Sequence, residues 1–247
     1  MTNPIRFLPA LALVLSATVS LGIADDEKAY PAAAKAHFDR ADKALNAAWA
    51  VAKSALGESE FAGLKQEQKA WLEYRDSIAR SPLHAGVAHE GELPLTSLEY
   101  LETAAFMAEE RTAWLLGLTR KWGDDENLSG EWSDSCGGSV RIVEQKGALV
   151  FSIECVRGPT SHTGEISGTA KWNQTIGWFS VKAEGEDEET SLSFILRDRK
   201  LEIIGANTGH FHGMRAYFDG EYVKTRLLTQ KERTAVLNGD RENDPDR

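Results

Sequence analysis

Three histidines in the second half of the chain have the residue type and spacing for metal chemistry. His210 and His212 are two residues apart. On a β-strand they would point to the same face, as a pair of metal ligands must. His162 is the only other histidine in this half and is the candidate third ligand. A metal-dependent hydrolase is therefore one hypothesis, and turn histidines that hydrogen-bond to the backbone are the alternative.

Other catalytic motifs are missing from the sequence. There is no Gly-x-Ser-x-Gly elbow, no phosphate-binding glycine loop and no His-Glu-x-x-His pair. The acidic run over residues 184–189 lacks the alternating Asp/Asn pattern of a calcium loop, and we expect a hairpin tip there. The sequence thus favours a protein that is not an enzyme, with no catalytic residues, no cofactor and no bound metal.

A loop rich in Gly and Pro is the stronger candidate for a binding site. It carries Arg157 and Thr160 on either side of Gly-Pro, with His162 following, and a second segment carries His212 and Arg215. Such loops often form sites, so we expect these five side chains to lie close together. They would either bind a partner or act as a latch in which Arg and His satisfy buried carbonyl groups.

The cysteine content is low. Cys136 and Cys155 are the two cysteines of the chain. In an oxidising compartment such a pair indicates one structural disulfide. A bridge that closes a loop of this size would contribute about 3 kcal/mol to stability. The alternative, a pair of metal ligands, lacks a Cys-x-x-Cys spacing.

The N-terminus has the pattern of a secretory signal peptide over residues 1–24. Arg6 is the only charged residue there, residues 7–23 are almost continuously apolar, and Gly22 and Ala24 are small. A membrane anchor is the alternative, although the apolar run is at the short limit for a span. No cysteine near the cleavage site is available for a lipid anchor. We expect a periplasmic or secreted protein that meets the membrane only transiently, through this peptide.

The charge balance is acidic. The chain has 28 Lys and Arg against 38 Asp and Glu, a net charge of −10. This argues against binding of nucleic acid, whose phosphates require Lys and Arg. It favours a cationic partner, or it serves only to keep the protein soluble.

Two periodicities predict an α+β fold with two domains. Over residues 34–122, apolar residues recur at steps of three and four, which predicts a helical domain of three antiparallel helices. Over residues 128–226, short β-branched and aromatic segments alternate with Gly, Asn and Asp clusters. These predict an antiparallel β-barrel or sandwich of about eight strands, the last over residues 214–223. Residues 229–247 are highly charged, and we expect a fraying helix followed by a flexible tail.

The helical half resembles the N-terminal domain of the LprI-like lysozyme inhibitors. The likeness rests on Ala41-Asp42-x-x-Leu45-Asn46, Gln68-x-x-Trp71-Leu72-x-x-Arg75-Asp76 and Glu110-Arg111-Thr112-x-x-Leu115. In this signature we expect Trp71 and Leu72 to hold the bundle together, and Arg75 and Asp76 each to pair with another helix.

The second half resembles the β-domain that follows such helical domains in exported bacterial proteins. The likeness rests on Val156-Arg157-Gly158-Pro159-Thr160-x-His162-x-Gly164 and on His212-Gly213-x-Arg215-Ala216-x-Phe218-Asp219-Gly220-x-Tyr222. Together the two resemblances imply an exported inhibitor of lysozyme-type muramidases, whose partner is a cationic lysozyme-type protein. An envelope binding or immunity-type module without lysozyme activity is the alternative.

Overall fold

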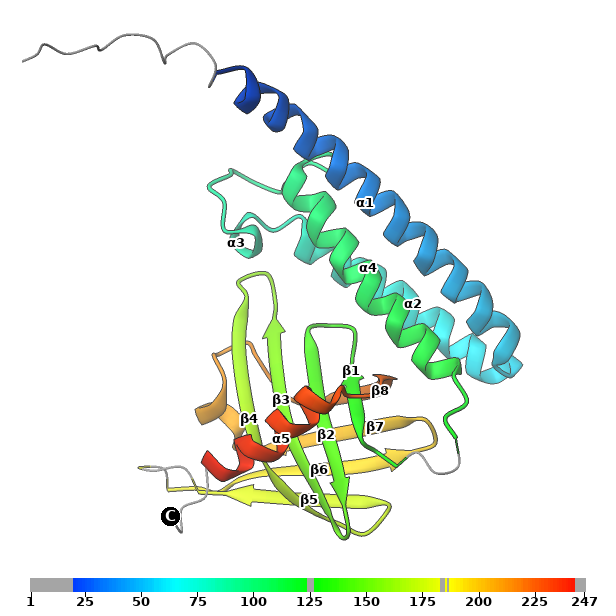
Figure 1. Cartoon of the computed structure of the whole chain (residues 1–247), viewed down its shortest axis with the longest axis vertical. Helices are drawn as coiled ribbons and strands as arrows, with labels where there is room; N and C mark the ends of the chain where they lie inside the picture. Colours follow the sequence, from blue (N-terminus) through cyan, green and yellow to red (C-terminus); the bar gives the residue numbers. More distant parts are fainter. Residues whose placement is uncertain (1–19, 124–126, 183–184, 186, 243–247) are drawn as a thin grey trace, which may run out of the picture.

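The chain folds as a group of helices followed by a closed β-barrel (Figure 1). The computed structural model describes residues 20–123, 127–182, 185 and 187–242, with the side chains of 30–123, 127–182, 185 and 187–239. The expected α+β class is confirmed, and the β-domain is a barrel rather than a sandwich. Most of the expected signal peptide lies outside the described residues. Within the described residues, no helix combines the length and the apolar character needed to cross a membrane.

Three long helices build the N-terminal domain. They are α1 (Ser20–Ala55), α2 (Glu58–Ala79) and α4 (Leu98–Thr119), and the short α3 (Pro82–Ala85) lies in the connection between α2 and α4. Helix α2 runs antiparallel to both of its long neighbours (Figure 1). Small side chains let α1 and α4 approach closely, and the buried alanines at this contact are Ala41, Ala48, Ala52, Ala104, Ala105 and Ala108.

The helix ends follow from local sequence. Gly57 and Glu60 begin α2, with the Glu60 carboxylate accepting a hydrogen bond from the Gly57 N–H at 3.1 Å. The hydroxyl of Ser97 accepts from the N–H of Tyr100 at 3.2 Å and so caps α4. Gly86 ends α3 with a φ of 69°, a left-handed conformation that suits glycine.

Eight antiparallel strands pair in sequence order, and β8 pairs with β1 to close the barrel. The strands are β1 (Gly130–Ser133), β2 (Gly138–Gln145), β3 (Ala148–Arg157), β4 (His162–Trp172), β5 (Ile176–Val181), β6 (Thr190–Arg197), β7 (Lys200–Ala206) and β8 (Gly220–Arg226). Closure pairs β1 and β8, the two strands that would otherwise form the edges of the sheet. Alternate side chains of the strands fill the interior, among them Phe151, Phe194 and Tyr222.

The last strand begins later than expected. Residues 214–219 form a loop, because Gly213 bonds to β4 and a turn follows: the Gly213 N–H donates to the Thr163 carbonyl and the Ala216 N–H donates to the Gly213 carbonyl, each at 2.9 Å. Ala216 and Phe218 point from this loop into the barrel core. The prediction of a strand over 214–223 is therefore wrong for its first half.

The C-terminal segment contains a helix, as the sequence predicted. Gln230–Glu242 form α5, which lies across the outer face of β2, β3 and β4 (Figure 1). Val236 is buried there against Val143 and Val150. Glu232 accepts a hydrogen bond from the Thr229 N–H at 2.8 Å and pairs with Arg226 at 2.6 Å, which anchors the start of α5. Residues 243–247 lie outside the described residues.

Candidate functional site

Two signature residues of the helical domain, Trp71 and Arg111, lie at the junction with the barrel. Trp71 is buried, and its indole Nε1 donates to the carbonyl of Ser135 at 2.9 Å. Ser135 belongs to the turn between β1 and β2 and has a φ of 58°. This turn therefore inserts its backbone against α2, and Trp71 ties the two domains together as well as packing within the helices.

Arg111 of α4 completes this contact. It is only 1% exposed, and its guanidinium stacks on the Trp114 ring with 4.1 Å between the guanidinium carbon and the ring centroid. It donates to Gln68 at 2.8 Å, to Glu67 at 3.0 Å and to the hydroxyl of Ser135 at 2.9 Å. A buried guanidinium needs several acceptors, and here they come from α2 and from the barrel.

Arg75 and Leu72 of the signature differ from expectation, whereas Asp76 agrees with it. Arg75 is buried but bonds to its neighbour Asp76 at 2.9 Å, so the prediction that it pairs with another helix is wrong. Asp76 does reach another helix, since it accepts a hydrogen bond from the Tyr100 hydroxyl of α4 at 3.3 Å. Leu72 is 38% exposed and therefore contributes little to holding the bundle together.

A second polar cluster lies next to this contact and is centred on Arg157. The Arg157 guanidinium is 2% exposed and pairs with Asp134 at 2.5 Å. It also donates to the carbonyl groups of Cys136 at 2.9 Å and Tyr217 at 3.3 Å. Arg157 therefore has the geometry of a latch, which ties the β1–β2 turn and the 212–219 loop to the end of β3. Asp134 and Ser135 were missed from the sequence; the turn-forming run Ser133–Gly138 was the available signal.

Glu110 of α4 faces the same cluster. Burial, reinforced by the negative charge of Asp134, raises the pKa of Glu110 to about 7, although Arg157 opposes the shift. The carboxyl groups of Glu110 and Asp134 thus both lie near Arg157, and the ion pair of Arg157 is with Asp134. The protonation state of Glu110 changes near neutral pH and alters the charge of the junction.

The other predicted site residues also gather at this end of the barrel. His212 forms an isolated bridge with Gly164, and a Cβ added to Gly213 would lie 2.9 Å from the Nδ1 atom of His162. His162 and His212 therefore lie in adjacent segments, as expected. Arg215 is exposed, and Met214 beside it is 92% exposed.

Helix α3 covers the loop between β3 and β4. The hydroxyl of Ser81 donates to the Pro159 carbonyl at 2.8 Å, and His84 Nδ1 lies 3.0 Å from the hydroxyl of Ser161. The hydroxyl of Thr160 is buried without a hydrogen-bond partner among the described residues. Much of the predicted binding loop is therefore in contact with the helical domain rather than with solvent.

The histidines do not share a strand face. His210 lies in a 3₁₀ turn, η1 (Thr208–Phe211), and His212 follows it. The ring nitrogens of His212 already have partners, the Thr208 hydroxyl at 2.9 Å and the Gly213 carbonyl at 3.0 Å. The hypothesis that His210 and His212 form a metal pair on one strand face is therefore wrong, and the alternative of turn histidines, of which His212 contacts a backbone carbonyl, agrees with the structure. No group of three or more His, Cys, Asp or Glu suited to a metal occurs in the described part of the chain.

The predicted disulfide is not present. Cys136 and Cys155 are both free thiols. Cys155 lies on β3 and packs inside the barrel, whereas Cys136 lies in the β1–β2 turn and packs against the helical domain. Burial raises the pKa of the Cys136 thiol to about 12. Spacing along the chain suggested a bridge, but the two side chains belong to different cores.

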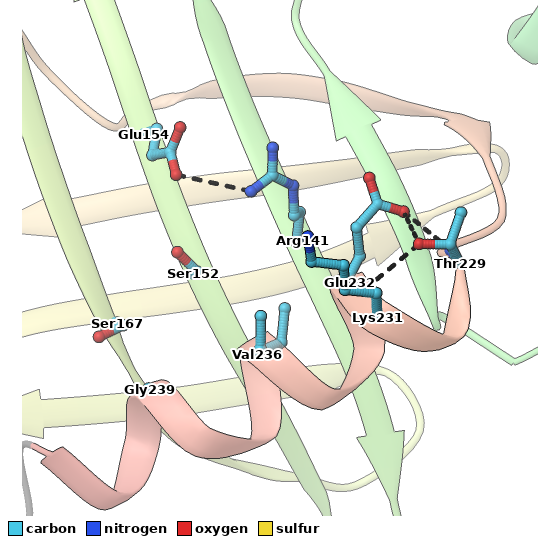
Figure 2. A pocket seen from close by; sticks show the side chains of 10 residues that line it. Arg141, Ser152, Glu154, Ser167, Thr229, Lys231, Glu232, Val236 and Gly239 are labelled. Atoms are coloured by element: carbon cyan, nitrogen blue, oxygen red, sulfur yellow. Dashed lines mark hydrogen bonds and ion pairs between the residues drawn. The ribbon is translucent and has the colours of Figure 1, made fainter.

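A groove on the far side of the barrel offers a separate cavity. It lies between α5 and the outer face of β2, β3 and β4, with a volume of about 530 Å³. Ser152 and Ser167 face Gly239 across it, and these small residues leave the space open (Figure 2). Arg141 and Glu154, paired at 3.6 Å, mark one end. The groove is thus polar at the end marked by Arg141 and Glu154, and its apolar part is limited to the surroundings of Val236.

Comparisons with known proteins bear on the helical domain. Residues 24–115 match the family model described as Lysozyme inhibitor LprI. The match includes α2, most of α1 and α4 up to Leu115, and it stops before the barrel. Neither the search of curated proteins nor the search of solved structures gives a match.

Proposed function

We propose that this protein binds and inhibits a lysozyme-type muramidase, because residues 24–115 match the family model described as Lysozyme inhibitor LprI. The family match over the helical domain is the observation that carries the proposal. The resemblance of the second half to β-domains of exported bacterial proteins also implied a β-domain after the helices, and the barrel agrees with it. The protein acts by binding and catalyses no reaction itself.

The charge of the chain supports this partner. With a net charge of −10, the protein attracts a basic enzyme over long range and favours fast association. A muramidase cleaves its glycan with a pair of carboxyl groups in an open cleft. An inhibitor needs only to occupy or cover that cleft, and it requires neither a nucleophile nor a metal.

The proposed location is the cell envelope. The signal-peptide pattern of residues 1–24 supports export, and a muramidase inhibitor is useful where the cell wall is exposed to attack. Two reduced cysteines, Cys155 buried and Cys136 partly buried, are compatible with this location, since a thiol that solvent and oxidants reach poorly reacts slowly.

Two surfaces are available for the contact. One is the barrel end around His162, His212 and Arg215, where Arg157 and Thr160 support the loop from inside. The other is the outer face of the helical domain. The family match ends before the barrel, which favours the helical domain as the inhibitory part.

Titration of the purified protein against c-, g- and i-type lysozymes tests the proposal. We expect at least one class to lose its lytic activity on cell walls at a near-stoichiometric ratio. An absence of inhibition of all three classes at micromolar excess would overturn it. Circular dichroism of the same sample checks that the protein is folded.

A second candidate function is a binding module for cell-wall fragments, without lysozyme activity. The observation that favours it is the α5 groove, whose volume of about 530 Å³ is in the usual range for small-molecule sites. Gly239→Leu should fill the groove, since a Cβ at Gly239 meets nothing within 4 Å. Binding of a muropeptide that this variant abolishes, with no inhibition of any lysozyme, would support this function instead.

A further inference from the structure

The solvent-facing side of α4 carries a regular row of residues. The exposed residues of this helix are Glu102, Phe106, Glu109, Ala113 and Leu116. The steps between them are four, three, four and three residues, which is the spacing of a coiled-coil seam. Phe106 is 60% exposed and Leu116 is 45% exposed. We refer to these five residues as the α4 stripe.

Helix α1 extends this surface on one side. His37 of α1 lies 2.8 Å from the carboxylate of Glu109, so the flank of α1 that carries His37 borders the α4 stripe. Ala44 and Val51 follow His37 at seven-residue steps, which places them on the same flank of the helix. Both are exposed. The flank and the stripe together form one solvent-facing surface, on which the Glu109–His37 pair lies between the apolar residues Phe106 and Leu116.

The rest of α4 is already occupied. Its opposite side packs on the barrel, where Trp114 is buried and Gly117 lies so close to β8 that an added Cβ would be 2.3 Å from the Lys224 carbonyl oxygen. Its other neighbours are α1 and α2. Docking of the barrel therefore leaves the α4 stripe as the face of this helix that can meet a partner.

The charges of this surface select the partner. Glu102 and Glu109 are the charged residues of the stripe, and both are carboxylates. A second copy of the chain would bring a stripe of the same sign against it, which disfavours a dimer through this face. Arg40 lies one turn after His37, at the edge of the α1 flank. The surface thus suits a basic protein that also offers an apolar contact.

We propose that the α4 stripe and its α1 flank are the surface that binds the muramidase. Phe106 is the apolar anchor, as exposed aromatic residues often are at protein interfaces. Glu102 and Glu109 face Lys and Arg side chains around the contact. This inference rests on the proposed function and adds to it the location of the contact.

Phe106→Arg tests the inference, with Met214→Arg as its matched control. Both replace an exposed apolar residue by the same cation, one on the α4 stripe and one at the barrel end. The readouts are the dissociation constant for a c-type lysozyme, or for whichever class the unsubstituted protein inhibits, and the inhibition of cell-wall lysis. We expect Phe106→Arg to raise the dissociation constant at least tenfold and Met214→Arg to leave it within twofold.

Glu102→Lys provides a second, independent variant. It should weaken binding several-fold at low salt and less at high salt, because screening removes the attraction that it reverses. Unchanged binding by both stripe variants, while the unsubstituted protein inhibits, would overturn the inference and leave the proposed function intact. Loss of inhibition through Met214→Arg alone would move the contact to the barrel end and would also overturn it. If the unsubstituted protein inhibits no lysozyme, the proposed function fails and the inference fails with it. Phe106→Ser replaces Phe106→Arg if the latter does not fold.

Discussion

Gly117 lies where α4 meets β8, and its replacement by alanine tests the way the two domains are docked. A Cβ at this position would lie 2.3 Å from the Lys224 carbonyl oxygen and 3.0 Å from Val223 Cγ1. Ordinary van der Waals contact begins at 3.4 Å. The helix or the strand would therefore have to move by about 1 Å to accommodate one methyl group.

The change in the free energy of unfolding combines one stabilising effect with two destabilising effects. Alanine is favoured over glycine inside a helix by about 1 kcal/mol. Overpacking against a backbone typically costs about 1–3 kcal/mol. A shift of α4 would also stretch the hydrogen bonds of Trp71 and Arg111 to Ser135, each of which contributes about 1 kcal/mol. We expect Gly117→Ala to lower the free energy of unfolding by about 2 kcal/mol.

Chemical denaturation followed by tryptophan fluorescence measures this change, since Trp71 and Trp114 lie at the junction. Gly63→Ala in α2 is the matched control, because a Cβ at Gly63 meets nothing within 4 Å. That variant should gain stability, by about 0.5–1 kcal/mol. If Gly117→Ala were stabilised as much as Gly63→Ala, α4 would not dock on β8 as described.

Three further predictions concern the junction and the cysteines. Arg157→Met leaves the carboxylate of Asp134 buried without its partner and should lower the free energy of unfolding by about 3 kcal/mol or more, as measured by denaturant titration; a loss below about 1 kcal/mol would refute the latch. Glu110 has a pKa near 7 in the folded state against 4.5 as its ordinary value, so the folded state binds the extra proton between these values. Stability should therefore fall as pH rises from about 4.5 to 7. Glu110→Gln should reduce this fall in the free energy of unfolding by roughly 1–3 kcal/mol. If the pH dependence of stability is the same with Glu110→Gln, Glu110 is not buried in the way described. Thiol titration with a disulfide reagent should detect almost no reactive cysteine in the folded protein and two after unfolding, because Cys136 and Cys155 are free and largely buried; if no thiol appears after unfolding, a bridge joins them.

Local patterns in the sequence predicted the elements of the fold. Steps of three and four gave the long helices, and short β-branched segments gave the strands. The class of the fold followed, because each element must bury its apolar face against another. Closure of the barrel had no local signal, since β1 and β8 lie at opposite ends of the domain. Residues 214–219 were predicted as part of a strand because they include apolar residues, but these residues enter the barrel core from a loop.

The site was predicted less well, for reasons that involve pairs of distant residues. The Trp71 and Arg111 positions were recognised as a signature, but their partner Ser135 lies 64 and 24 residues away and belongs to a turn. The cysteine pairing failed because chain spacing does not say into which core a side chain points. The proximity of His162 and His212 was anticipated, since the Gly-rich segments around both indicated unusual backbone in contact.

A cell-wall lysis assay decides whether the purified protein inhibits a lysozyme. The measurement is the rate at which a c-, g- or i-type lysozyme clears a cell-wall suspension as the protein is titrated in. If the protein is a lysozyme inhibitor, the rate falls with added protein and approaches zero near a one-to-one ratio for at least one class. An unchanged rate for all three classes at micromolar excess of folded protein would contradict it.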